Sequence, residues 1–196
     1  MLNAIHTTHR QLTQSDFAID APLMARALIG ATLLVDGAGG IIVETEAYDV
    51  DDPAAHCHGG LTARNRAMFG APGHAYVYRS YGLHWCLNLV CREEGHGAGV
   101  LIRALQPTQE LDAMRARRGV ENERLLCSGP GRVGQALGIS LAHYGLPLDR
   151  PPFSVLAPAD PASLNIISGM RIGISKARKT PWRFGLAGSP YLSRKF

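Results

Sequence analysis

The stretch from residue 41 to residue 60, IIVETEAYDVDDPAAHCHGG, constrains the fold most, because an apolar run opens directly into acids, a tyrosine and histidines. Residues 41–48 predict a β-strand, in which successive side chains point to opposite faces. One face would then carry an aliphatic side chain, two carboxylates and a phenol: Ile42, Glu44, Glu46 and Tyr48. The polar run 49–53 favours a turn, which would put both acids near a strand end, where folds commonly form clefts. A solvent-facing strand would show the same pattern.

Similar patterns along the rest of the chain predict more strands than helices. Residues 31–36 and the glycine-rich turn 37–40 predict a hairpin with the 41–48 strand. The aromatic block 74–90 predicts a second hairpin that turns at residues 79–82. Further strands are expected at 99–105, 153–156 and 166–174, and short helices at 23–28, 63–69, 108–118 and 128–137. We therefore expect an α+β fold over residues 1–196, a single domain whose curved, mostly antiparallel sheet carries a protruding β-hairpin and is flanked by short helices.

Composition points to a globular chain with a basic surface. Of the 196 residues 46% are hydrophobic, and the net charge is +4. The basic residues divide into 17 arginines and three lysines, and arginine is suited to bidentate recognition of phosphate. A G- and C-rich genome would produce the same excess. The N-terminus lacks the apolar core of a signal peptide and no run reaches the length of a membrane span, so we expect a cytoplasmic protein without membrane contact.

The cysteines and glycines do not form a recognisable metal or nucleotide motif. The four cysteines include no CxxC pair. His56-Cys57-His58 groups three possible ligands, but adjacent side chains on an extended chain point apart and no second ligand pair follows at finger spacing. The glycines of SGPG at residues 128–131 do not fit the phosphate-loop pattern. We therefore predict no metal and no cofactor.

Three polar or aromatic residues occupy positions that need partners. Tyr81 lies beside a glycine at a predicted hairpin tip, where an exposed ring is unfavourable unless it folds onto the core or meets a binding partner. Asn88 is an amide on a largely apolar strand. Arg103 is embedded among apolar neighbours and calls for a carboxylate, with Glu44 and Glu46 as candidates, or for a phosphate. Residues 176–184 mix cations with aromatics, which is consistent with a nucleic-acid contact or with a solvated rim.

Several segments, in this order and spacing, resemble one known family. They are ARALIGATLL, IVETEAY, AAHCHGG, RNRAMF, YVYRSYG, CLN, VLIRALQP, LCSGPGRVGQALGI and RFGLAGSPYLS. Together they are similar to the alkyladenine, or methylpurine, DNA glycosylases, the 3-methyladenine DNA glycosylases of the mammalian type. The departures lie in residues 119–124 and 140–168 and in the polar pair Arg79-Ser80, and they bear on lesion preference and DNA grip.

The resemblance implies a role for each candidate site residue. Glu46 would be the general base that activates a water, and Arg103 a basic residue that supports the site. Tyr81 would enter the minor groove and fill the gap left by a flipped nucleotide. The base pocket would be formed by Tyr48, His56, Tyr78 and Asn88, with Asn88 discriminating against guanine.

The implied activity is excision of alkylated or deaminated purines from double-stranded DNA by a monomer, which in a bacterium would be associated with the nucleoid. The base would be flipped out and its N-glycosidic bond hydrolysed by water, leaving an abasic site. Bifunctional glycosylases attack with an amine, and the first lysine is Lys176, outside the motif region. One alternative is a non-catalytic damaged-DNA binding protein of the same fold. A glycoside hydrolase using Glu44 and Glu46 is a third, although carboxylates only about 7 Å apart on one strand face do not flank a substrate.

Overall fold

The computed structural model describes residues 10–196, so residues 1–9, on which part of the signal-peptide expectation rests, lie outside the described residues. Its eight strands form one antiparallel sheet in the order β3-β4-β5-β2-β1-β6, and β8 pairs with both β2 and β7. The strands are β1 (Thr32–Val35), β2 (Ala38–Asp49), β3 (Ala75–Ser80), β4 (His84–Val90), β5 (Ala98–Gln109), β6 (Phe153–Leu156), β7 (Ile166–Gly169) and β8 (Arg183–Leu186). The expected α+β fold with a curved antiparallel sheet is confirmed.

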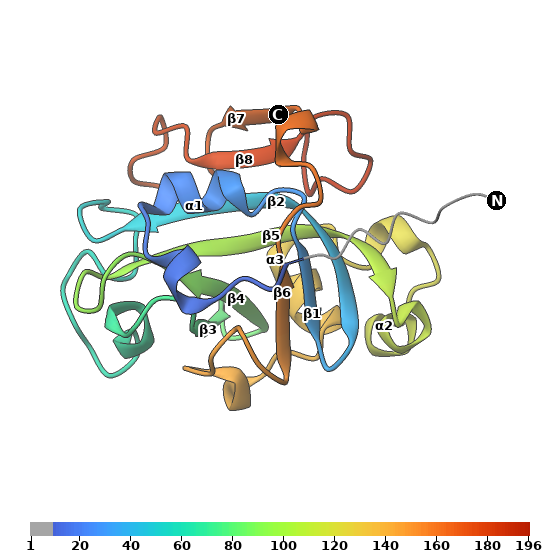
Figure 1. The fold of residues 1–196 in the computed structure, drawn as a ribbon, viewed down its shortest axis with the longest axis horizontal. Coiled ribbons are helices and arrows are strands. Elements are labelled where there is room, and N and C mark those ends of the chain that lie inside the picture. Colours follow the sequence, from blue (N-terminus) through green and yellow to red (C-terminus); the bar gives the residue numbers. More distant parts are fainter. Residues whose placement is uncertain (1–9) are drawn as a thin grey trace.

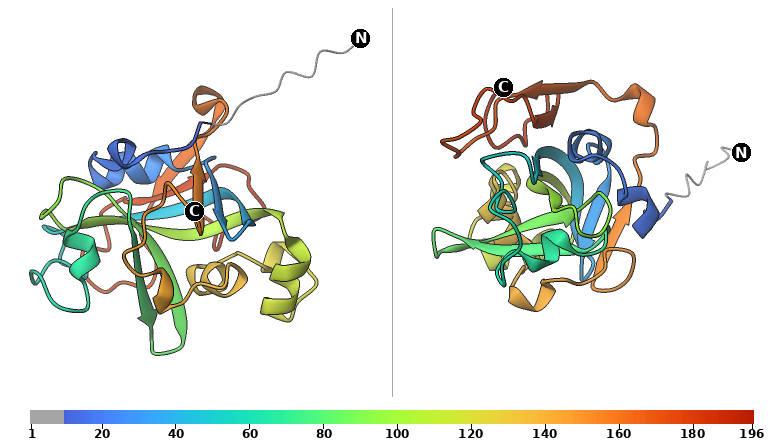
Figure 2. Two further views of the ribbon diagram at one scale, coloured as in Figure 1. Left: turned by 60° about the horizontal axis from the view of Figure 1, so that its bottom comes forward. Right: turned by 90° about the vertical axis from the view of Figure 1, so that its left-hand side faces the viewer.

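Three short α-helices cover this sheet: α1 (Ala21–Ala27), α2 (Leu111–Arg118) and α3 (Pro130–Ala136). Figure 1 shows α1 lying along β2, with β7 and β8 beyond it, while α2 lies towards the other end of the molecule and α3, which packs on β4 and α2, lies nearer the middle. The hairpin of β3 and β4 projects from the body, as Figure 2 shows, and this agrees with the expected protruding hairpin. No helix within residues 10–196 is long and apolar enough to cross a membrane.

The main hydrophobic core lies between the sheet and the helices, and only some of the side chains of β2 point into it. Ile42 packs in this core together with Ala47, not beside the acids. The predicted sharing of one face by Ile42 and Glu44 is therefore wrong. The pairing of β2 with β5 shifts register between Ile42 and Glu44 and again between Glu44 and Thr45, and such a β-bulge reverses the alternation that an unbroken strand would keep.

Several predicted boundaries also move. The turn before β2 is shorter than expected, because β2 already pairs with β1 at Ala38. The predicted helix 108–118 begins only at Leu111, since β5 runs through Gln109. The predicted strand 166–174 ends at Gly169 as β7, and the following residues leave the sheet. In the mixed basic and aromatic segment, residues 183–186 form β8, which the sequence analysis did not anticipate.

The glycines at the start of α3 serve close packing. A Cβ atom at Gly134 would lie 1.9 Å from the backbone oxygen of Trp85 on β4. At Gly131 it would lie 2.9 Å from Cβ of His84. Because contacts this short cannot be accommodated against backbone, glycine is what lets α3 approach β4 so closely.

Candidate active site

A pocket of about 510 Å³ opens between β2, the β3–β4 hairpin and the segment that follows β7. All five residues predicted to form or support the base pocket line it: Tyr48, His56, Tyr78, Asn88 and Arg103. Tyr81 also contributes to its lining, as do Ile172 and its neighbours up to Lys176. Residues that are far apart in the chain therefore meet here, and the segment 172–176 was not predicted to take part.

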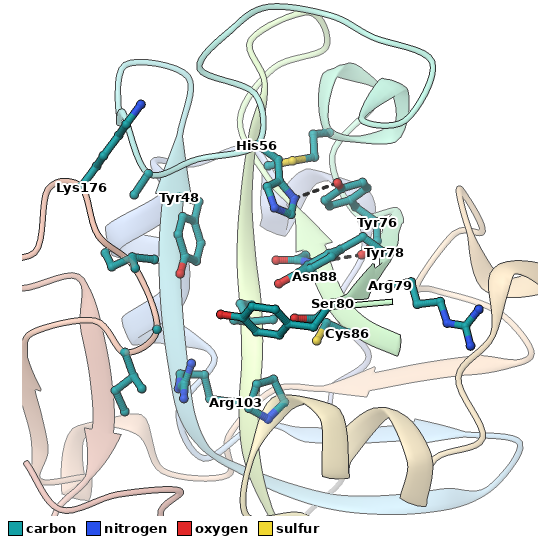
Figure 3. Close-up of a pocket in the computed structure, with 18 of the residues that line it drawn as sticks. Tyr48, His56, Tyr76, Tyr78, Arg79, Ser80, Cys86, Asn88, Arg103 and Lys176 are labelled. Carbon is teal, nitrogen blue, oxygen red and sulfur yellow. Dashed lines mark hydrogen bonds between the residues drawn. The ribbon is translucent and has the colours of Figure 1, made fainter. Parts of the chain in front are cut away.

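The walls of the pocket are aromatic. Figure 3 shows Tyr48 on one side and His56 with Tyr78 on the other. The His56 and Tyr78 rings meet edge to face, with centroids 4.5 Å apart. Tyr78 also stacks on Tyr76 at 5.8 Å and an interplanar angle of 23°. A planar ring inserted between Tyr48 and the opposite wall would find apolar faces on both sides, which is the favoured environment for a nucleobase.

Tyr76 was missed as a pocket residue, although its position on the same strand face as Tyr78 was the available signal. Its side chain is buried, and its hydroxyl lies 3.0 Å from Nδ1 of His56. Burial, and then the charge of Arg64, lower the pKa of His56. His56 is therefore a neutral imidazole at neutral pH, with one donor and one acceptor nitrogen.

The neighbours of His56 do not join it in a common site. The Cys57 thiol donates to the backbone oxygen of Gly97, and Nδ1 of His58 lies 3.0 Å from the backbone oxygen of Val50. Across residues 10–196 no three His, Cys, Asp or Glu side chains are grouped so that they could hold a metal ion. The three side chains of His56-Cys57-His58 thus have separate partners.

Glu46 is fully buried, is not itself one of the residues that line the pocket, and accepts three hydrogen bonds. Its donors are the backbone N–H of Ile172 at 2.7 Å, the Tyr48 hydroxyl at 2.9 Å and Nη1 of Arg103 at 3.2 Å. Burial raises the pKa of Glu46, against the opposing effects of Arg103 and of the two other donors. All three donor residues line the pocket, so this carboxylate lies directly behind the pocket surface.

Glu44 has a different environment, although it also is fully buried. It binds Nε of Arg103 at 3.1 Å and Nε of Arg183 at 2.8 Å. Arg103 was predicted to need a carboxylate. This is confirmed, because Arg103 binds both Glu44 and Glu46. Arg183 points inward to Glu44, so neither a nucleic-acid contact nor a solvated rim describes this residue of the basic segment. Glu44 and Glu46 lie two positions apart on β2 and share Arg103, so they do not face each other across a substrate as paired acids would.

Asn88 links the two strands of the hairpin and also faces the pocket. Its Nδ2 donates to the backbone oxygen of Tyr76, its partner on β3, at 3.3 Å. Its Oδ1 receives no hydrogen bond from residues 10–196. Since Asn88 is 4% exposed and lines the pocket, this oxygen is positioned to contact a bound ligand.

Tyr81 occupies the tip of the hairpin and is 86% exposed. The backbone N–H of Leu83 donates to the oxygen of Ser80, and Tyr81 and Gly82 have φ values of +50° and +69°. These are the features of a type I′ turn, whose twist matches that of the strands it joins. The alternative that this ring folds back onto the core is wrong, because the tight turn directs it into solvent.

A second buried ion pair lies behind Tyr48 and was missed by the sequence analysis. Arg171 binds Asp52 with both terminal nitrogens and also donates to the backbone oxygen of Ala47. Its guanidinium lies 4.8 Å from the centre of the Tyr48 ring and 5.5 Å from that of Trp182. The only signal was an arginine within an apolar run. The donor role of the Ile172 backbone has no sequence signal, because every residue except proline has an N–H.

Comparison with known proteins identifies the family to which these features belong. The sequence model of the family described as methylpurine-DNA glycosylase matches residues 15–190, nearly the whole chain. The chain belongs to this family. It is therefore a DNA glycosylase, a hydrolase that acts on N-glycosyl bonds. Of the alternatives, a non-catalytic binding protein is accordingly not supported.

Bacterial relatives cover the glycosylase almost end to end. A protein of Nitrosospira multiformis is 64% identical over 92% of this chain and 93% of its own length. One of Nitrobacter winogradskyi is 59% identical over 95% and 89%, and one of Rhizobium meliloti 59% identical over 96% and 100%. Each is provisionally named a 3-methyladenine DNA glycosylase. The narrower resemblance to the mammalian type is not supported by these bacterial relatives.

Proposed function

We propose that the protein removes alkylated or deaminated purines, of the 3-methyladenine, hypoxanthine and ethenoadenine class, from duplex DNA. The observation that carries this proposal is the position of Glu46, a buried carboxylate directly behind a pocket with aromatic walls. The provisional names of the bacterial relatives agree with this substrate class. The partner is double-stranded DNA that contains a damaged purine, bound by one copy of the chain in the cytoplasm, at the nucleoid of a bacterial cell.

The positions of the pocket and the hairpin support a mechanism that flips the base. A base inside a duplex cannot reach Glu46, so it must be extruded at a cost of a few kcal/mol, which is smallest for damaged or mispaired bases. Tyr81 is an exposed ring at the end of the β3–β4 hairpin, at the edge of the same pocket. Inserted through the minor groove, it would replace the stacking that the flipped base leaves behind.

The chemical step uses Glu46 as general base. A water oxygen attacks C1′ of the sugar, one of its protons passes to Glu46, and the electron pair of the N-glycosidic bond leaves with the purine. The raised pKa of Glu46 makes it a stronger base than an exposed glutamate. Its negative charge also opposes the positive charge that develops on the sugar. An alkylated purine that is already cationic leaves readily without further protonation.

Attack by water, without strand cleavage, is favoured over attack by an amine. Lys176 contributes to the lining of the pocket and is the one lysine for which a Schiff base is conceivable. Figure 3 shows its side chain directed away from Tyr48 and from the interior of the pocket. The glycosylase would therefore be monofunctional, and no metal or other cofactor takes part in the proposed step.

A gel assay with defined duplexes tests the proposal. Duplex oligonucleotides carrying one hypoxanthine or one 1,N6-ethenoadenine are incubated with the protein in EDTA, and abasic sites are then cleaved with alkali. We expect a cleaved band only for the damaged strand and only after alkali. Bands that form without alkali, together with a borohydride-trapped adduct that Lys176→Ala abolishes, would show a Schiff-base mechanism instead. Intact DNA from every lesion duplex would contradict the substrate class.

A further inference from the structure

Glu44 is the centre of a buried network that the proposed chemistry does not use. It is fully buried and accepts four hydrogen bonds. Two come from Nε of Arg103 and Nε of Arg183, and two from Ser193, through its backbone N–H and its hydroxyl, the latter at 2.7 Å. Ser193 is 149 residues away in the sequence and lies beyond β8. A segment near the end of the chain therefore reaches the region behind the active site.

The guanidinium of Arg103 connects this network to Glu46. Its Nε donates to Glu44 at 3.1 Å, its Nη1 to Glu46 at 3.2 Å, and its Nη2 contacts the Ser193 hydroxyl at 3.5 Å. A guanidinium is planar and rigid, so fixing two of its nitrogens fixes the direction of the third. The direction of Nη1 towards Glu46 is thus set by Glu44 and Ser193.

An arginine beside a carboxylate normally prefers two parallel hydrogen bonds to it. Arg103 makes only one to Glu44, and it shares Oε1 of that carboxylate with Nε of Arg183 and the Ser193 hydroxyl, while Oε2 accepts from the Ser193 backbone N–H. Nη1 of Arg103 donates to Glu46 instead. The four charged groups, Glu44 and Glu46 with Arg103 and Arg183, also balance in charge, as a buried cluster requires.

The segment that carries Ser193 is held in place on the same side. Arg183 donates from Nη2 to the backbone oxygen of Arg194 at 2.6 Å, and its guanidinium lies 3.9 Å from the centre of the Phe196 ring. Resting on the proposed function, we propose that Glu44 and Ser193 are positioning residues for excision, which hold Arg103 in the orientation that orients and polarises Glu46. Residues 193–196 are then part of the catalytic apparatus, although they do not line the pocket.

The first test is Ser193→Ala, which removes one hydroxyl and keeps the backbone N–H. Arg103 can then turn to bind Glu44 with two nitrogens and withdraw from Glu46. We expect the single-turnover excision rate on a hypoxanthine duplex to fall by about 10- to 100-fold, the size of one lost hydrogen bond to a charged group. The dissociation constant for the duplex stays unchanged. Ser193→Thr restores the rate, and Ser189→Ala is the matched control, because the Ser189 hydroxyl only accepts from the backbone N–H of Tyr191.

The second readout is the acidic limb of the pH–rate profile, which a merely structural role would not move. In Ser193→Ala the limb moves to higher pH, because Glu46 loses the stabilising cation. In Glu44→Gln it moves to lower pH, because Glu46 loses a neighbouring negative charge and gains more of Arg103. The proposal therefore predicts that Ser193→Ala and Glu44→Gln move the acidic limb of the pH–rate profile in opposite directions.

The outcomes separate this inference from the proposed function. If Ser193→Ala has the excision rate and the acidic limb of the wild type, the inference is overturned, whether or not Glu44→Gln folds. A lower rate with an unmoved limb overturns it as well, because that result describes a purely structural residue. Glu46→Gln is measured in parallel. If that variant remains fully active, the assignment of the base fails, whereas an inactive Glu46→Gln beside a normal Ser193→Ala removes only the inference made here.

Discussion

The hydroxyl of Tyr48 donates a hydrogen bond of 2.9 Å to Oε2 of Glu46, two positions earlier on β2. One residue is a wall of the pocket and the other is the carboxylate behind it. A ring that stacks on Tyr48 is therefore brought next to Glu46 by the strand itself. In the proposed mechanism, alternation along a single strand would couple recognition of a base to the chemistry at its sugar.

Glu46→Gln removes the proposed base with little change of shape. We expect the single-turnover excision rate from a hypoxanthine duplex to fall at least about 100-fold, the usual contribution of general base catalysis. Binding of the lesion duplex should survive, because the aromatic walls are intact. Glu121→Gln is the control, since the Glu121 side chain is 93% exposed. Glu44→Gln is not a neutral control, because Glu44 is buried and holds two arginines. Near-normal turnover in Glu46→Gln would show that another group activates the water.

The pH dependence should follow the ionisation of Glu46. Burial raises its pKa above the usual range of a glutamate, so the excision rate should rise with pH through that raised pKa and then level off. The folded state also holds this proton more tightly than the unfolded chain does. The stability that this proton contributes is present below the unfolded pKa and is lost as pH rises through the folded pKa. Measurement of the excision rate from pH 4.5 to 8 tests this rise, and the Glu46→Gln variant should not show it.

Tyr81→Ala should weaken binding of lesion duplex and slow excision from duplex more than from single-stranded DNA. Only in the duplex does the flipped base leave a gap in the stacked bases that the ring of Tyr81 can fill. Tyr81→Phe keeps the ring and should behave almost as wild type. Parallel rates on both substrates measure the difference. Because this side chain is 86% exposed, the melting temperature should not change. Equal losses on duplex and single strand would contradict a wedge.

Asn88→Ser should relax the exclusion of guanine. Guanine differs from hypoxanthine by one exocyclic amine, and Asn88 holds its amide against the pocket through its bond to the Tyr76 backbone. A buried amine without a partner costs about 1 to 3 kcal/mol on top of any clash. Shortening the side chain should raise release of 7-methylguanine or guanine relative to hypoxanthine, as measured by chromatography of the freed bases. If the variant folds and this ratio stays constant, Asn88 serves only to join the two strands.

Asp52→Ala should destabilise the fold, because it leaves Arg171 buried without its counter-ion. Breaking one side of a buried pair typically costs about 3–5 kcal/mol, while replacing both partners with apolar residues costs less. Urea unfolding of Asp52→Ala and of the double variant Asp52→Leu with Arg171→Met measures both. The pair also supports the back of the Tyr48 ring, so the excision rate of Asp52→Ala should fall as well. A double variant that is no more stable than the single one would contradict this reading of the pair.

The sequence by itself determined the features that depend on local periodicity and on chemical need. Alternation along residues 41–48 placed Glu46 beside Tyr48, and the tyrosines and glycine of the aromatic block indicated a hairpin with a ring at its tip. An arginine among apolar neighbours required a carboxylate, and Arg103 has two. These inferences hold because side chains alternate along any stretch of strand without a bulge, and because a buried charge without a partner is costly in any fold.

Only the tertiary structure decided what meets across long distances in the chain. The bulge near Glu44 turns Ile42 into the core, a shift that depends on the register of β5. The Ile172 backbone N–H donates to a carboxylate 126 residues away, and Ser193 to one 149 residues away. The local sequence around a backbone N–H or a serine hydroxyl does not indicate which acceptor it will meet in the fold. Its partner is selected by the packing of the whole sheet, because a buried carboxylate must be satisfied by whichever donors that packing brings to it.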